Sequence, residues 1–193
     1  MGPGQALTLP ARRRHDRRAS WASAAAASIT AILALNAGPN VPALTSLIAG
    51  AGLAALATTD AAAHRLPAMQ MQVLAGLTAV TMIGSAWWHD DWGPPLRALV
   101  GAALVAVLLV SLWLSLPGAI AFGDVKVTVI AFAAAAAISW RAGVVTIIVA
   151  CVIGGVAAVI ARRTRRHLAP VQPTIPFVPG LALGFVVGVM VPW

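Results

Sequence analysis

Long apolar runs alternate with short polar loops along most of the chain. A helix needs about 20 residues to span a bilayer, with a range of roughly 17–25. The pattern predicts an all-α polytopic membrane protein of about seven transmembrane helices. We place them at 21–38, 41–59, 69–88, 97–117, 125–140, 142–161 and 175–193. The run at 125–140 is short and the Ala- and Ser-rich run at 21–38 is only weakly apolar, so six spans is the alternative to seven.

Composition supports a membrane protein. The 193 residues are 60% hydrophobic and 9% charged, with a mean hydropathy of +0.90. A soluble domain would carry charge on roughly a quarter of its residues. The net charge of +8 would suit nucleic acid, but the basic residues cluster at the ends of apolar runs, where they act as topology signals. The lipid bilayer is therefore the expected partner, and nucleic acid is not.

The basic residues also predict an orientation. With a cytoplasmic N-terminus and alternating spans, only Arg97 and Arg141 fall outside. The remaining Lys and Arg residues lie on the cytoplasmic side: Arg12, Arg13, Arg14, Arg17, Arg18, Arg65, Lys126, Arg162, Arg163, Arg165 and Arg166. Asp90 and Asp91 then lie in an outer loop, which we expect to be a solvated polar turn.

The same topology divides the chain into three parts. Residues 1–20 form a basic cytoplasmic tail, 21–38 form an extra N-terminal span, and 41–193 form the membrane core. The tail and the run after it also fit a cleaved signal peptide. The end of that run lacks an A-x-A cleavage site, so an uncleaved span is the expectation. The chain has one cysteine, Cys151, which excludes an internal disulfide and a CxxC metal site.

Two aspartates are the strongest candidates for chemistry. The chain has five acidic residues, all Asp, and the topology places Asp60 and Asp124 at the cytoplasmic ends of apolar runs. A carboxylate at a membrane boundary is costly to keep, which favours a functional role. Two carboxyl groups that share a proton could activate water. The alternative is structural: each Asp caps a helix end or pairs with a nearby Arg such as Arg65.

Three short segments around this pair resemble the motifs of a known family. Asp60 is followed by Arg65 and Pro67, Asp124 lies in Gly123-Asp124-Val125-Lys126, and Pro176, Phe177 and Pro179 open the last apolar run. In these elements and their order, the chain from about residue 41 to 193 resembles the type IV prepilin peptidases, membrane aspartic proteases of the GxGD kind. The resemblance extends through Leu181 and Gly184, which follow Pro179 at the spacing of the family's last element.

The resemblance implies a function and a site. Asp60 and Asp124 would be catalytic, and Arg65, Pro67, Gly123, Lys126, Pro176, Phe177 and Pro179 would support them. The substrate would be a prepilin with a basic leader, cleaved at the cytoplasmic face of the bacterial plasma membrane without a cofactor. Without paired CxxC motifs the chain resembles the short form, similar to those serving Flp/Tad-type pili, and no methyltransferase activity is expected.

Two positions depart from the family pattern. Ala121 stands where the first Gly of the G-x-G-D motif is expected, and Ala68 stands where Asn commonly follows the proline. The first change leaves open an alternative, a catalytically inactive scaffold of a pilus or secretion assembly. A small proton-coupled transporter is a further alternative, but such proteins place acids near the bilayer midplane. The four His residues are dispersed over both sides, so no metal site is predicted.

Overall fold

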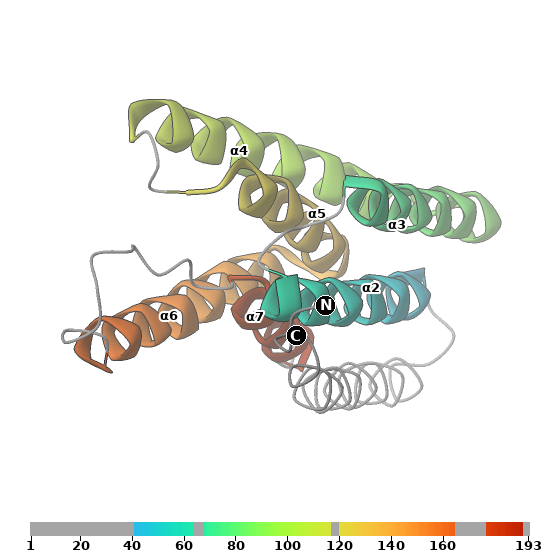
Figure 1. The fold of residues 1–193 in the computed structure, drawn as a ribbon. Helices are drawn as coiled ribbons and strands as arrows, with labels where there is room; N and C mark the ends of the chain where they lie inside the picture. The colour runs from blue at the N-terminus through green and yellow to red at the C-terminus, as the bar shows by residue number, and fades with distance from the viewer. Residues whose placement is uncertain (1–40, 64–67, 117–119, 165–176, 191–193) are drawn as a thin grey trace, which may run out of the picture.

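The computed structural model describes residues 41–63, 68–116, 120–164 and 177–190, and these form six helices (Figure 1). The predicted tail at 1–20 and span at 21–38 lie outside the described residues. The helices are α2 (Val41–Ala63), α3 (Ala68–His89), α4 (Gly93–Ser115), α5 (Phe122–Ile138), α6 (Trp140–Thr164) and α7 (Val178–Met190). Each lies on an apolar run predicted from the sequence.

Two helix boundaries differ from the prediction in a way that affects the site. Helix α2 continues to Ala63 and α5 already begins at Phe122, so Asp60 and Asp124 lie in terminal helical turns and not in the adjoining loops. The predicted boundaries lie where the apolar residues end, but backbone hydrogen bonding continues past that point. The amides of Asp124 and Val125 both donate to the carbonyl of Ala121, at 3.0 and 3.3 Å.

Three of the described helices are long and apolar enough to cross a membrane: Ala68–His89, Gly93–Ser115 and Trp140–Ile160. The same three helices, α3, α4 and α6, carry rows of exposed large apolar side chains, among them Val80, Leu104 and Ile148. Apolar surface of this extent on the outside of a fold suits lipid and not water. The described part of the chain is thus an all-helical protein with membrane-spanning character, and seven spans remains a prediction.

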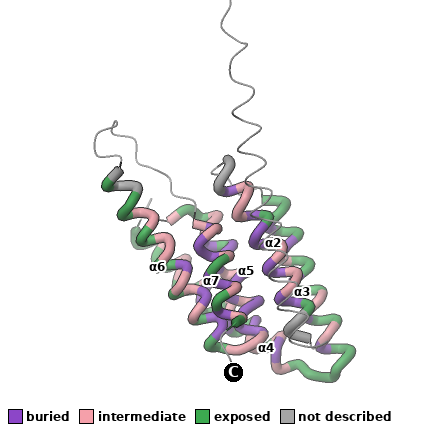
Figure 2. The backbone as a smooth tube through the Cα atoms, turned by 90° about the horizontal axis from the view of Figure 1, so that it is seen from below, coloured by how far each residue is buried: buried purple, intermediate pink, exposed green. Residues whose placement is uncertain are grey.

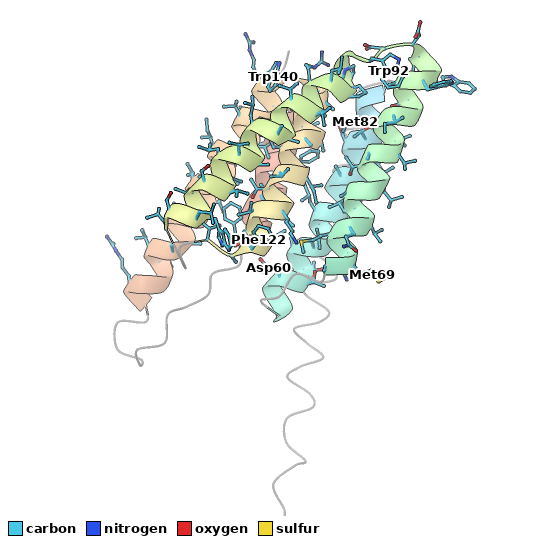
Figure 3. All side chains as sticks on the ribbon, turned by 90° about the horizontal axis from the view of Figure 1, so that it is seen from above. Asp60, Met69, Met82, Trp92, Phe122 and Trp140 are labelled. Atoms are coloured by element: carbon cyan, nitrogen blue, oxygen red, sulfur yellow. The ribbon has the colours of Figure 1, made fainter. Side chains whose placement is uncertain are left out.

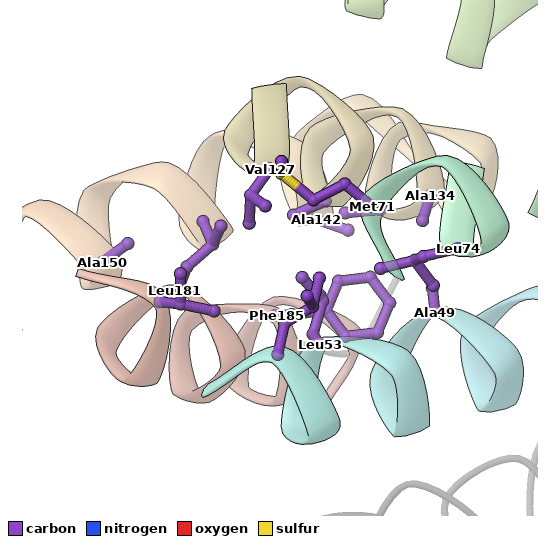
Figure 4. Packing of buried hydrophobic residues seen from close by; sticks show 14 residues of the cluster. Ala49, Leu53, Met71, Leu74, Val127, Ala134, Ala142, Ala150, Leu181 and Phe185 are labelled. Carbon is purple, nitrogen blue, oxygen red and sulfur yellow. The ribbon is translucent and has the colours of Figure 1, made fainter. Parts of the chain in front are cut away.

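Helix α5 occupies the interior. Nine of its residues are buried, among them the alanines at 134, 135, 136 and 137. Small side chains let neighbouring helices approach closely, which is how membrane helices gain packing contacts. Figure 2 shows buried positions gathered on α2, α5 and α7. Figure 4 shows the resulting core, in which Leu53, Val127 and Phe185 from these helices meet.

Helices α6 and α7 pack through glycine. A Cβ on Gly184 would collide with the carbonyl oxygen of Thr146, and one on Gly188 would stand 2.6 Å from the carbonyl oxygen of Ala142. Gly180 faces the carbonyl oxygen of Ala150 in the same way, at 3.3 Å from an added Cβ. Glycines spaced four residues apart therefore form a flat face on α7 against the α6 backbone. This contact fixes the position of the α7 N-terminus.

The two ends of the bundle differ in character. In Figure 3, Asp60, Met69 and Phe122 lie at one end, and Trp92 and Trp140 lie at the other. The α3–α4 connection at the tryptophan end is a tight turn, with Asp90 at a φ of 52° and the Asp91 carboxylate accepting a 2.9 Å hydrogen bond from the Gly93 amide. Both aspartates are exposed. The prediction of a solvated polar turn is confirmed.

Candidate active site

The structure brings Asp60 and Asp124 together from helices that are far apart in the sequence. Asp60 comes from the last turn of α2 and is 6% exposed. Asp124 comes from the first turn of α5 and is half-buried. Burial raises the pKa of the Asp124 carboxyl group, and the charge on Asp60 raises it further, so the two carboxyl groups interact. Two interacting carboxyl groups at one end of the bundle can share a proton.

Asp60 also interacts with the N-terminus of α7. Its Oδ2 accepts a hydrogen bond of 3.3 Å from the backbone amide of Val178, the first residue of that helix. The first amides of a helix have no partner within it, and the helix dipole favours negative charge there. Val178 itself is fully buried. The contact therefore places a carboxylate against a positive helix end in a protected environment.

Asp124 lies in a different environment. It precedes the apolar run of α5 and is outside all three candidate membrane spans. Burial, with a further contribution from the Asp60 charge, raises the pKa of Asp124 to about 6. The structure has Ala121 as the N-cap of α5, with no side-chain capping bond. Asp124 is thus not the helix cap that was the structural alternative at this position.

Ala121 fits its position without strain. Its φ of −74° and ψ of 140° are extended values that any residue adopts, so the backbone there does not need glycine. Gly123, expected in the loop before Asp124, lies instead within the first turn of α5. The departure from the family pattern at Ala121 therefore leaves the backbone around Asp124 in an ordinary helical start.

Lys126 is directed toward α4. Its Nζ stands 4.7 Å from the centre of the Phe122 ring, a cation–π contact, and that ring lies 5.2 Å from the ring of Trp113. One way in which Lys126 could support the pair is to keep Asp124 ionised. The raised pKa of Asp124 speaks against that role, because a dominant nearby cation would lower it. Lys126 is instead part of an aromatic contact at the helix start.

An open groove of about 390 Å³ lies between α3, α4 and α5 at this end of the bundle. Phe122 and Val125, which flank Asp124 in the sequence, are among its lining residues. The lining is apolar apart from Gln72 and Lys126. The groove thus offers apolar surface along α5, the helix that carries Asp124.

The third sequence element is only partly described. Phe177 packs its ring over Gly154 of α6, at 3.3 Å from where a Cβ on that glycine would stand. Pro179 is the second residue of α7, a position where proline costs no hydrogen bond. Arg65, Pro67 and Pro176 lie outside the described residues. The structure therefore connects the third element to Asp60 through the Val178 amide.

Sequence reasoning missed two contacts at the site. The Val178 amide could not be predicted because a backbone donor leaves no mark on residue type. Thr59, next to Asp60, donates its hydroxyl to Gln70 Oε1 of α3 at 3.4 Å, and this pairing depends on how the helices pack.

The chain matches no protein-family model, no curated protein and no solved structure.

Proposed function

We propose that the protein is a membrane aspartic endopeptidase that removes the basic leader from type IV prepilins, most closely of the Flp/Tad kind. The observation that carries this proposal is the pairing of Asp60 and Asp124, which come from separate helices and interact electrostatically at one end of an apolar helical bundle. Two coupled carboxyl groups are the means by which aspartic proteases activate water.

In the proposed reaction the two carboxyl groups hold one proton and one water molecule between them. The ionised carboxylate takes a proton from the water, whose oxygen attacks the scissile carbonyl, and the protonated carboxyl group donates its proton to the carbonyl oxygen. The resulting tetrahedral diol loses the amine, which leaves with the proton taken from the water. The second hydroxyl proton returns to the other carboxylate, and the dyad is restored.

The location of the pair suits such a substrate. A prepilin leader is followed by an apolar helix that stays in the bilayer, so the scissile bond lies at the membrane surface. Asp60 and Phe122 lie at one end of the bundle (Figure 3), and Asp124 is in the same helical turn as Phe122. The groove with Phe122 and Val125 in its wall supplies apolar surface for that apolar substrate helix. In this proposal the site end faces the bacterial cytoplasm, and a seven-span chain has its N-terminus on that side.

Substitution of the pair tests the proposal. Co-expression with a prepilin should give leader removal by the wild type, seen as a mobility shift of the pilin. Asp60→Asn and Asp124→Ala should each abolish the shift, because one carboxyl group cannot both accept and donate the required protons. The exposed Asp91, at the opposite end, offers the matched control: Asp91→Asn should process normally. Normal leader removal by Asp124→Ala would overturn the proposal.

A further inference from the structure

The two carboxyl groups of the pair have unequal surroundings. Asp60 is nearly fully buried, and its Oδ2 accepts the Val178 amide at 3.3 Å. An amide at a helix N-terminus interacts more favourably with a carboxylate than with a neutral carboxyl group. Asp124 lies in the first turn of α5, whose dipole also favours a carboxylate, but among the described residues no amide donates to its carboxyl group as Val178 does to Asp60.

The charged groups around Asp60 can be assigned element by element. Asp60 belongs to α2, which packs against α3, α5 and α7. Helix α3 has one titratable group, His89, at the opposite end, and α7 has none. Helix α5 contributes Asp124, and Lys126, whose Nζ lies over the Phe122 ring. His64 and Arg65 lie outside the described residues. Among the described residues, the Val178 amide donates a hydrogen bond to one carboxyl group of the pair, that of Asp60, and not to the other.

We infer that the backbone amide of Val178 is a positioning group that holds Asp60 as the ionised member of the pair. Asp60 is then the base that takes the proton from water, and Asp124 is the acid that protonates the scissile carbonyl oxygen. The raised pKa of Asp124 agrees with its role as the acid, because burial favours its protonated form. This assignment rests on the proposed peptidase function and adds the role of each carboxyl group.

The inference also gives the third sequence element a function. Phe177 anchors the entry to α7 against Gly154 of α6, and the glycine face of α7 fixes the helix along α6. Pro179 has no amide hydrogen, so Val178 provides the first free amide of the helix and the following position provides none. The element therefore presents the Val178 amide to Asp60.

A proline at position 178 tests this donor directly. Val178→Pro removes the amide hydrogen, and proline is favoured at the first position of a helix. Val178→Ala is the matched control, because it loses the branched side chain and keeps the amide. Both are assayed for kcat/KM over a range of pH on a peptide with a basic leader ending in Gly and an apolar segment, in proteoliposomes.

The two limbs of the pH profile distinguish the roles. In a pair that works with one proton, the acid limb reports protonation of the ionised member and the basic limb reports proton loss from the other. Val178→Pro should move the acid limb to higher pH by about one unit and leave the basic limb in place. Val178→Ala should keep both limbs where the wild type has them. A shift of the basic limb, or no shift, would overturn the assignment.

An infrared measurement on the full chain keeps the inference testable if no prepilin is cleaved. At about pH 5, where exposed aspartates are ionised, the wild type should show a protonated-carboxyl band. The band should disappear in Asp124→Asn and persist in Asp60→Asn. The reverse pattern would overturn the assignment even in a protein that processes its substrate. Failure of the wild type to cleave any prepilin would count against the peptidase proposal. The infrared spectrum would still show which of Asp60 and Asp124 is ionised.

Discussion

Asp60 and Asp124 have the same side chain, and their surroundings give them different properties. Asp60 is 6% exposed and has a backbone amide donor from α7, whereas Asp124 is half-buried at the start of α5 beside the Asp60 charge. Burial and a like charge both make ionisation of Asp124 unfavourable. Part of the cost of holding the pair together therefore falls on Asp124, and this part depends on pH.

This dependence predicts a trend in stability. The pKa of Asp124 rises from 3.8 to about 6 in the folded protein, so the folded state binds more protons than the unfolded state between these values. The contribution of Asp124 to stability is fully present below pH 3.8 and is lost as the pH rises through about 6. As the pH falls, the thermal unfolding midpoint of the wild type in detergent should therefore rise relative to that of Asp124→Asn. A gain with rising pH would contradict the burial of Asp124 described here.

At the scale of helices, the α6–α7 contact positions the site. Gly184 has no room for a side chain because the Thr146 carbonyl oxygen lies against it, while Gly155, on α6, has nothing within 4 Å of an added Cβ. Any sideways movement of α7 would carry the Val178 amide away from Asp60. The packing of these two helices thus bears directly on the geometry of the pair.

Alanine substitutions at the two glycines compare a tight site with an open one. Gly184→Ala should lower the free energy of unfolding by about 1–3 kcal/mol, because the added methyl group meets backbone that cannot easily yield. Gly155→Ala should be neutral or stabilising by about 0.5–1 kcal/mol, since alanine is the better helix former. Thermal unfolding in detergent measures both. Equal effects at the two positions would show that α6 and α7 are not packed as described.

The elements were predictable from the sequence to different degrees. The six described helices follow from apolar runs, and the solvated turn at Asp90 and Asp91 follows from its polar residues. The candidate aspartates were found because charge is rare in this chain. Their placement in helical turns was missed, since a charged residue ends an apolar run without ending a helix. The Val178 amide was also beyond prediction, because it depends on three-dimensional packing between α2 and α7.

At the scale of the whole molecule, the helices alternate in direction, so that connections lie at two opposite ends. The α3–α4 turn with His89 lies at the end with Trp92, and Asp60 and Phe122 lie at the other (Figure 3). Helix α6 starts at Trp140 near the first of these ends and finishes in a segment with the exposed Arg163. The distribution of basic residues predicts that the end with Arg163 faces the cytoplasm.

Cysteine labelling tests this orientation in cells. In a Cys151→Ser background, His89→Cys and Arg163→Cys each place one thiol on an exposed residue at opposite ends of the bundle. A membrane-impermeant maleimide should label His89→Cys in intact spheroplasts and label Arg163→Cys only after the membrane is permeabilised. The reverse result would place Asp60 and Asp124 on the outer face, where a cytoplasmic leader could not reach them. Labelling of both thiols from one side would contradict the alternation of the helices, because one face cannot hold both ends of a bundle that spans the bilayer.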